Sequence, residues 1–175
     1  MADMNLERLP TFVDEETFHV VVESPRGSSV KLKYAGHFEA FSISRPLPIG
    51  LTYPFDWGFV PSTKADDGDP VDAAIVWDVA TFPGVVIPCR ALALIKVEQN
   101  RAGTNQRARN DRILAVPVES RRDRTLESWK QLGDRRREEL NLFFLTAAAL
   151  EGKDPQILGW DEPAAALQLL RSSNA

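Results

Sequence analysis

Several features of common protein classes are scarce or missing in this sequence. One cysteine, Cys89, stands among 175 residues, which excludes an internal disulfide and a cysteine-based zinc site within one chain. No hydrophobic run approaches the roughly 18 residues of a membrane span, and no internal repeat or low-complexity linker is visible. The first residues include several acids and lack the apolar stretch of a secretory signal. We therefore expect a single domain over residues 1–175, in the cytoplasm and without a membrane partner.

Excess positive charge is also missing. The chain has 21 Lys and Arg against 25 Asp and Glu, a net charge of −4, which argues against a dedicated duplex nucleic-acid binder. Arginines do gather in the segment 101–112 and at 121–122 and 135–137. Proteins that bind single-stranded RNA usually add aromatic side chains on which bases stack, and none are interleaved with these arginines. RNA binding is therefore the weakest of our functional hypotheses, and we expect no nucleic-acid partner.

The pattern of hydrophobic residues changes once along the chain. Between residues 12 and 118, short β-branched runs are separated by Gly, Pro, Asn and Asp, which predicts strands. The predicted strands cover residues 17–24, 28–34, 40–45, 72–79, 84–97 and 112–118. Many short strands without long helices between them are typical of an antiparallel sheet or a closed barrel. We therefore predict a β-rich fold with a closed antiparallel barrel over residues 12–118.

Residues 119–175 have the composition of a helical part that covers one side of the barrel. A short helix is predicted up to Leu132, and a last helix over 161–171. Between them, the spacing of apolar residues predicts a helix over 134–152 that ends at a glycine. The apolar face of this longer helix is formed by Leu140, Phe143, Phe144, Ala147 and Leu150.

Four carboxylates lie within seven residues in the sequence DDGDPVD at 66–72. Such a cluster repels itself, so a fold that gathers it usually supplies a cation, and carboxylate oxygens are ligands that hard ions such as Mg²⁺ prefer. An EF-hand is excluded, because Pro70 interrupts its ligand pattern and no glutamate closes the loop. The alternative is an acidic turn exposed to solvent, which is the more common case for an isolated cluster.

The surrounding sequence distinguishes between these alternatives. LTYPFDWGFVP at 51–61, followed by DDGDPVDAAIV, resembles the soluble inorganic pyrophosphatases of the first family, and the similarity extends from about Phe18 to Ala166. It includes ESPRGSSVKLKY, ISRPLP and RILAVP, and more weakly FFLTAAALEGK. The resemblance implies a closed OB-like barrel of about five strands with flanking C-terminal helices. It also implies Mg²⁺-dependent hydrolysis of pyrophosphate to two phosphates, and a homo-oligomer, with a hexamer expected.

The resemblance implies a role for individual acidic and amide side chains. Asp67 and Asp72 match metal ligands, with Asp72 as the bridging ligand, and Asp69 matches the carboxylate that activates the attacking water. Glu23 matches a glutamate that helps to hold a metal ion through water. Asn110 stands where the family has a metal-binding acid. Because its amide oxygen can coordinate a cation but carries no charge, we expect weaker metal binding than in full-complement members.

Four other residues match the part of the family's site that binds substrate. Lys31 and Arg45 match phosphate-binding cations, and Arg112 replaces a lysine of the same function. Trp57 replaces a tyrosine; it keeps an aromatic wall but offers an N–H donor in place of a hydroxyl. Each charged residue, taken alone, also fits an ordinary surface position. Their order relative to the acidic cluster favours the functional interpretation. We expect Lys31 and Arg45 to converge on one cavity with the carboxylates of Glu23, Asp67, Asp69 and Asp72.

Other positions depart from the family more severely. Lys33 stands where the family has an acidic residue. A second acidic residue of the family aligns with Gln99, or, in a less favoured alignment, with Glu98. A tyrosine–lysine pair that binds phosphate is replaced by Ala147 and Ala148. Each missing hydrogen bond to a charged group is worth about 1.5–3 kcal/mol, which weakens binding roughly tenfold to hundredfold. The outer half of the predicted pocket therefore lacks two ligands.

Two main hypotheses follow. The chain is a divergent but working pyrophosphatase, which the intact DGDPVD motif favours, or a catalytically weakened or inactive homologue that binds phosphate or acts as a subunit partner. For the working enzyme, we predict that the segment Arg101–Arg112 folds over the pocket, where Arg107 and Arg109 replace the lost pair. The alternative for this segment is a mobile, solvated loop.

Overall fold

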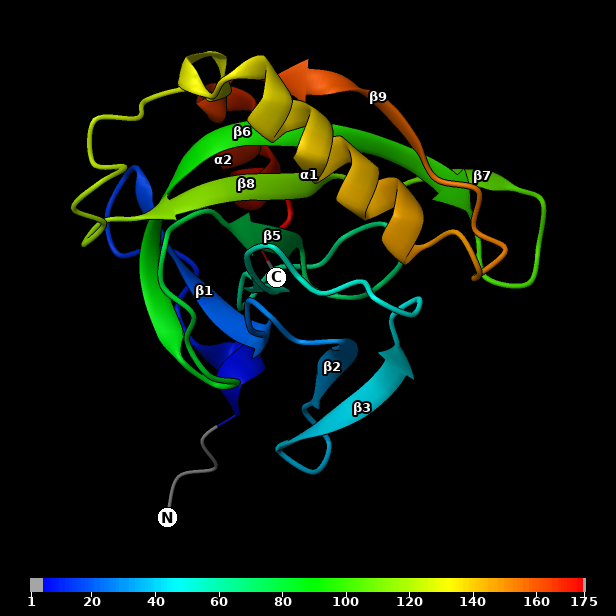
Figure 1. The fold of residues 1–175 in the computed structure, drawn as a ribbon. Coiled ribbons are helices and arrows are strands. Elements are labelled where there is room, and N and C mark those ends of the chain that lie inside the picture. The colour runs from blue at the N-terminus through cyan, green and yellow to red at the C-terminus, as the bar shows by residue number, and fades with distance from the viewer. Residues whose placement is uncertain (1–4, 175) are drawn as a thin grey trace.

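Five strands form a closed ring in the computed structural model, which describes residues 5–174 (Figure 1). In order around the ring they are β1 (Thr17–Ser24), β4 (Asp56–Phe59), β5 (Asp72–Ile75), β8 (Arg112–Pro117) and β6 (Val86–Asn100). β6 also pairs with β1, and this pairing closes the barrel. The OB-like barrel of about five strands is therefore confirmed.

One pairing in the ring is parallel, which corrects the expected antiparallel arrangement. β5 runs parallel to β8, with Asp72 opposite Arg112, whereas the other neighbouring strands of the ring are antiparallel. The reason is geometric: an odd number of strands cannot alternate in direction around a closed ring, so one pair must share a direction. This parallel pair places the first residue of β5 beside the first residue of β8.

Four further strands extend the structure beyond the ring. β2 (Val30–Ala35) and β3 (Ala40–Pro46) form a separate antiparallel hairpin, and β7 (Arg107–Arg109) and β9 (Gln156–Asp161) pair with the distal part of β6. The sequence does not predict β4, β7 or β9, and β9 lies in the segment predicted to be helical. β7 and β9 form because β6, at 15 residues, extends past the ring and offers an edge on each side.

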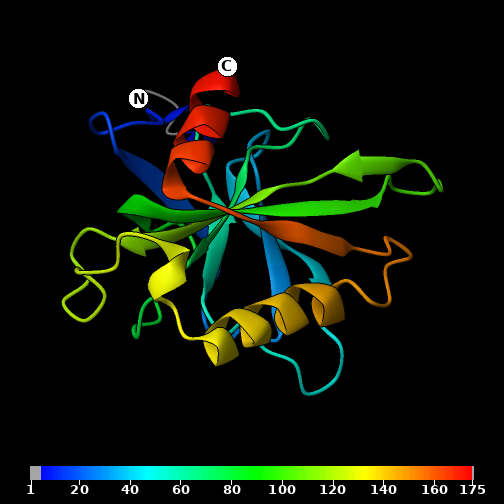
Figure 2. The same ribbon diagram turned by 90° about the horizontal axis from the view of Figure 1, so that it is seen from above.

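Two α-helices lie on opposite sides of the barrel, α1 (Asp134–Ala147) and α2 (Pro163–Ser172) (Figure 2). α2 agrees with the predicted last helix and buries Ala166 and Leu170 in a core cluster with Phe18 of β1. Near the N-terminus, a single 3₁₀ turn, η1 (Leu6–Arg8), precedes β1. None of the helices in residues 5–174 is both long enough and apolar enough to cross a membrane.

The other two helix predictions need correction. The helix predicted over 134–152 is too long, because the chain passes through 3₁₀-type turns after α1, and Gly152 then adopts a φ of 65°. Leu150, predicted on the apolar face, is consequently 80% exposed. The helix predicted up to Leu132 is reduced to one 3₁₀ turn, η2 (Trp129–Gln131), which a capping box at its start stabilises.

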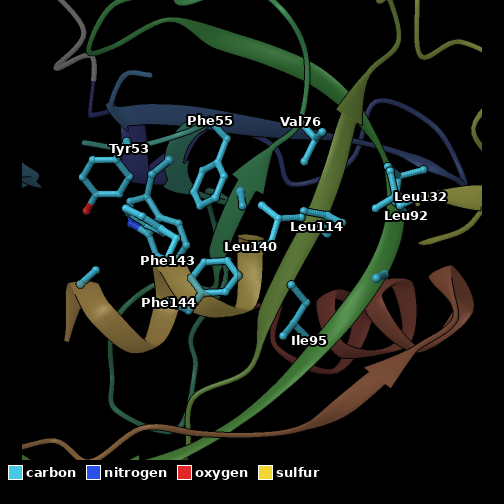
Figure 3. Packing of buried hydrophobic residues seen from close by; sticks show 14 of the residues in the cluster. Tyr53, Phe55, Val76, Leu92, Ile95, Leu114, Leu132, Leu140, Phe143 and Phe144 are labelled. Atoms are coloured by element: carbon cyan, nitrogen blue, oxygen red, sulfur yellow. The ribbon is translucent and has the colours of Figure 1, made fainter. Parts of the chain in front are cut away.

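A cluster of aromatic side chains joins α1 to the barrel (Figure 3). The rings of Phe143 and Phe144 lie 5.1 and 5.6 Å from the ring of Phe55, and Phe144 lies 6.0 Å from Trp57. The burial of these large apolar side chains is the main source of the free energy that holds α1 on the barrel. Since Trp57 also lines a cavity, the packing of α1 shapes the candidate site.

Candidate active site

The acidic and amide residues selected from the sequence line one cavity. It has a volume of about 90 Å³. Its walls come from β1, β2, the turn before β5, and Asn110, which lies between β7 and β8. The predicted site residues that line it are Glu23, Lys31, Asp67, Asp69, Asp72 and Asn110. The fold thus gathers oxygen donors from distant parts of the chain at one end of the barrel.

A tight turn holds the carboxylates of Asp67 and Asp69 at the edge of this cavity. Gly68 between them has a φ of 87°, in the left-handed region that glycine adopts without strain. The Asp67 carboxylate accepts a hydrogen bond of 3.1 Å from the backbone N–H of Asp69, which stabilises the turn. Asp72 follows as the first residue of β5, since Pro70 has no N–H with which to extend the strand.

Glu23 is a carboxylate that the fold removes from solvent, with 6% of its surface exposed. One of its oxygens accepts a hydrogen bond of 2.8 Å from the backbone N–H of Tyr34. Burial raises the pKa of Glu23 to about 7, and the charge of Asp72 adds to this effect. The Tyr34 hydrogen bond and the charges of Lys31 and Lys33 oppose the shift without cancelling it. A cation in the cavity would therefore favour the ionised form of Glu23.

Arg112 is a buried cation, 8% exposed, and it has no carboxylate partner in the described part of the chain. Its guanidinium lies 5.4 Å from the ring centroid of Trp57 and 4.9 Å from that of Phe144, and its Nε is buried without a hydrogen-bond partner. Burial lowers the pKa of Arg112, and the attraction of Asp72 offsets this in part. Burial also raises the pKa of Asp72, while Lys31 and Arg112 oppose that shift. A buried, unpaired guanidinium is suited to bind an anion.

A second cavity of about 40 Å³ adjoins the first and shares Lys31 with it. Trp57 and Arg112 line it, and Trp57 Nε1 is a second buried N–H donor without a partner. Arg45 also lines this second cavity and not the acidic one, so the expected convergence of all these residues on one cavity is wrong for Arg45. Its Nε is 3.5 Å from a carboxylate oxygen of Glu151. The remaining wall contains the buried Ala147 and Ala148, which replace the family's tyrosine and lysine.

Contrary to our prediction, the arginine-rich segment does not fold over the cavities: residues 101–109 line neither of them, and only Asn110 and Arg112 at its end do. It forms β7, which pairs with the end of β6 and projects from the barrel (Figure 1). Arg107 forms ion pairs with Glu98 at 3.0 Å and Asp154 at 3.2 Å, and Arg109 binds Asp111 at 2.7 Å. Because these acids already satisfy both guanidinium groups, neither arginine replaces the lost pair.

The side chains next to Asn110 do not replace the missing metal-binding acids either. One oxygen of Asp111 accepts a hydrogen bond of 3.0 Å from the backbone N–H of Val97, so this carboxylate is directed at β6. Glu98 binds an arginine of β7, and Gln99 is buried. None of these three residues lines the acidic cavity, where Asn110 alone represents this part of the chain.

Lys153 is a cavity residue that the sequence analysis missed. It lies in the turn between α1 and β9 and lines the acidic cavity. Burial lowers the pKa of Lys153, and the nearby positive charges of Lys31 and Arg45 lower it further. Two sequence signals point to it: Lys153 ends the stretch FFLTAAALEGK that weakly resembles the family, and it follows Gly152, whose positive φ turns the chain back toward the barrel after the helix. Lys153 thus adds a cation near the place where the family's lysine is missing.

The donor set fits a hard divalent ion. Carboxylate oxygens of Glu23, Asp67 and Asp72 and the amide oxygen of Asn110 line the same cavity, and these are the ligands that Mg²⁺ prefers. In the described residues, no three acidic, histidine or cysteine side chains lie close enough together to bind one ion as they stand. Small side-chain movements or bridging waters are therefore needed for coordination, and Mg²⁺ usually keeps several waters.

Comparisons with known proteins agree with the sequence resemblance. A family model described as "Inorganic pyrophosphatase" matches residues 20–175. Proteins with that name from Synechocystis and from Thermus thermophilus are each 34% identical, over 95% and 96% of this chain and 95% of their own lengths.

Solved structures support the same relationship. A crystal structure of the inorganic pyrophosphatase from Thermus thermophilus matches with a TM-score of 0.88 and 33% identity, covering 97% of this chain and 96% of that one. An inorganic pyrophosphatase from Coxiella burnetii matches with a TM-score of 0.85 and 30% identity, covering 94% and 97% of the two chains. The similarity therefore extends over the barrel and both helices.

Proposed function

Because this chain belongs to the inorganic pyrophosphatase family, we propose that it hydrolyses inorganic pyrophosphate to two phosphates with the help of Mg²⁺. The observation that carries the proposal is the adjacency of two unlike cavities that share Lys31. Carboxylate and amide oxygens that can bind a metal ion line one cavity. Buried N–H groups without acidic partners, which can donate hydrogen bonds to an anion, line the other. A substrate that carries several negative charges together with a metal counter-ion needs both kinds of wall.

In this proposal, Asp69 takes the proton from the attacking water. Its side chain is about half exposed at the edge of the acidic cavity, so water has access to it. Asp67, Asp72, Glu23 and Asn110 would hold the ion. A bound Mg²⁺ would lower the pKa of the attacking water and offset the charge of the substrate.

The cations and the indole N–H would hold the substrate. Lys31 lies between the two cavities and can contact phosphoryl oxygens in either. Arg112 and Trp57 present buried donors to the second cavity, where Arg45 adds a further charge. These donors stabilise the oxygens whose negative charge grows as the bridging P–O bond breaks. Lys153 supplies a further cation to the acidic cavity.

The proposal is tested by phosphate release from pyrophosphate with Mg²⁺, beside nucleoside triphosphates and short polyphosphate. We expect Asp69→Asn to lower kcat by roughly 10²–10⁴-fold, as the loss of a general base does. Asp66→Asn is the matched control, because Asp66 is exposed in the same turn but does not line the cavity. Equal loss in both variants contradicts the assignment of Asp69, and phosphate release by the parent no faster than without protein contradicts the proposed function.

The second candidate is a catalytically weakened or inactive homologue that binds phosphate or acts as a subunit partner. Ala147 and Ala148 favour it, because both are buried and leave part of the phosphate cavity without donors. The same assay separates the two functions. A protein that binds phosphate in calorimetry but does not release it from pyrophosphate supports the second candidate.

We also propose that the protein is a homo-oligomer, with a hexamer as the expected form, and that it works in the cytoplasm. Leu142 and Leu145 support self-association, since they are 65% and 37% exposed on the outer face of α1. The reducing cytoplasm suits the unpaired, buried thiol of Cys89. Light scattering after size exclusion measures the oligomer directly, and Leu142→Glu is expected to shift it toward smaller species.

A further inference from the structure

Lys33 and Asp69 form a direct ion pair at the mouth of the acidic cavity. The Nζ atom of Lys33 lies 2.6 Å from Oδ2 of Asp69, and both side chains line the cavity and are about half exposed. Among the described residues that line this cavity, no other cation contacts a carboxylate within ion-pair distance. An ammonium group therefore already neutralises one carboxylate of the cavity that would hold a metal ion.

The backbone on both sides of Lys33 is fixed to β1. The Leu32 N–H donates to the Ser24 hydroxyl at 2.8 Å, and the Tyr34 N–H donates to the Glu23 carboxylate at 2.8 Å. β2 also pairs with β3, where Lys33 lies opposite Ser42. The stem of the lysine therefore starts from a defined position beside the carboxylates and is not on a free loop.

Lys33 is surrounded by negative charge. Burial lowers its pKa, but the hydrogen bond and charge of Asp69 raise it, and the more distant Glu23 and Asp72 raise it further. The net result is a pKa above the usual value for a lysine, so the side chain is protonated near neutral pH. A permanent positive charge at this point repels a divalent ion and competes with it for Asp69.

From this geometry we propose that Lys33 is a built-in cation that takes the place of one metal ion at Asp69. The acidic cavity then binds divalent metal more weakly, and binds fewer ions, than the same cavity would with an acid or a neutral residue at position 33. The inference rests on the proposed function only in assuming that the cavity binds a divalent ion. It goes beyond that function because it assigns a role in metal stoichiometry to a residue outside the expected ligand set.

The test is calorimetric titration of the metal-free protein with Mg²⁺, in the absence of pyrophosphate. We expect Lys33→Gln to lower the dissociation constant roughly fivefold, and Lys33→Glu to lower it roughly tenfold or more and to add a bound ion, because the charge changes at close range. Arg121→Gln and Arg121→Glu are matched controls, since Arg121 is exposed and does not line the cavity. The controls are expected to bind Mg²⁺ like the parent.

Two results would overturn the inference. Unchanged affinity and stoichiometry in both Lys33 variants would show that the ammonium does not compete with metal. Weaker binding of inorganic phosphate by Lys33→Gln, at unchanged Mg²⁺ affinity, would make Lys33 a substrate ligand. The half-exposed position of Lys33 makes both variants compatible with folding, and thermal unfolding verifies this. Because no turnover is measured, a lack of pyrophosphate hydrolysis would contradict the proposed function without affecting this result.

Discussion

The backbone N–H of Asn100 donates a hydrogen bond of 2.7 Å to the carbonyl oxygen of Lys153. Next to it, Nη1 of Arg107 donates to the backbone oxygen of Asp154 at 2.8 Å and to its carboxylate at 3.2 Å. The β6–β7 hairpin therefore does not enter the acidic cavity but holds the turn that carries Lys153 into it. Asp154 has a φ of 43°, which costs free energy for a non-glycine residue, so these contacts also maintain an unfavourable backbone conformation.

Lys153 is expected to contribute to substrate binding. We expect Lys153→Met to raise KM for pyrophosphate about tenfold to hundredfold, because a charged hydrogen bond to phosphate is lost. Lys153→Arg is expected to recover part of the loss, since the guanidinium keeps the charge. Steady-state kinetics measures both, with Lys64→Met as a control at an exposed position outside the cavities. A parent-like KM in Lys153→Met would exclude contact with the substrate.

Arg107 is expected to act through Lys153. Arg107→Ala removes the contacts with Asp154, so we expect KM to rise about fivefold to tenfold while kcat changes less. Arg109→Ala is the matched control on the same hairpin, because Arg109 binds Asp111 and does not contact the turn. In the background of Lys153→Met, Arg107→Ala is expected to have little further effect on KM. Additive effects of the two changes would mean that Arg107 does not position Lys153.

The fold could be predicted where the chain carries its own signal. β1 (17–24) and α2 follow from β-branched runs and from a helix-start pattern, both of which are local. β4 is too short for such a signal and contains Gly58, where an added Cβ would lie 1.9 Å from the backbone oxygen of Val21. Glycine is thus required there by the close approach of β1, and one sequence does not reveal this approach.

The candidate site also contains residues that could be predicted from the sequence and residues that could not. The acidic turn could be predicted because Asp67, Asp69 and Asp72 are close together in the sequence, although their roles as ligands and base stay predictions. The position of Lys153 could not be predicted, because it depends on hydrogen bonds from a hairpin that is distant in sequence. The prediction for Arg107 was wrong since it counted the arginine charges and could not include the acids that pair with them.

Glu23 is expected to make the stability of the metal-free protein depend on pH. Its pKa is about 7 in the folded protein, raised by burial, against a usual 4.5. The folded state therefore holds the proton more tightly, so this stabilisation is complete below about pH 4.5 and is lost as the pH rises to about 7. Over this pH range, the free energy of unfolding of the parent is expected to fall by roughly 3 kcal/mol because of Glu23, and we expect Glu23→Gln to remove this pH-dependent decrease. Urea unfolding with chelator, at about pH 4.5 and about pH 8, measures it; a pH-independent difference from the parent would contradict the assignment.

Asp56 is expected to be a structural carboxylate. It is completely buried. Its carboxylate accepts hydrogen bonds of 2.7 Å from the backbone N–H of Arg26 and from the hydroxyl of Thr81. Asp56→Ala leaves these donors without partners, so we expect the free energy of unfolding to fall by roughly 3 kcal/mol. Asp78→Ala is the control, because Asp78 is exposed and its pair with Arg122 is worth at most about 1 kcal/mol. Urea unfolding of both variants measures the difference, and equal losses would contradict a structural role for Asp56.

Ala148→Lys is expected to restore part of the missing phosphate site. The residue is buried at the end of α1 and lines the cavity that contains Arg45 and Arg112. In the free protein the added charge lies near these cations, so we expect a lower melting temperature than that of the parent. Phosphate neutralises this repulsion, so millimolar phosphate is expected to raise the melting temperature of the variant more than that of the parent.

The same variant is expected to lower KM for pyrophosphate about tenfold, because a lysine returns where the family has one. Ala149→Lys is the matched control, since the next residue is exposed and does not line the cavity. It adds the same charge, so any effect of net charge alone appears in both variants, whereas a restored ligand appears only in Ala148→Lys. A parent-like KM in Ala148→Lys, together with a phosphate response no larger than that of the control, would mean that the substrate does not occupy the cavity beside Ala148.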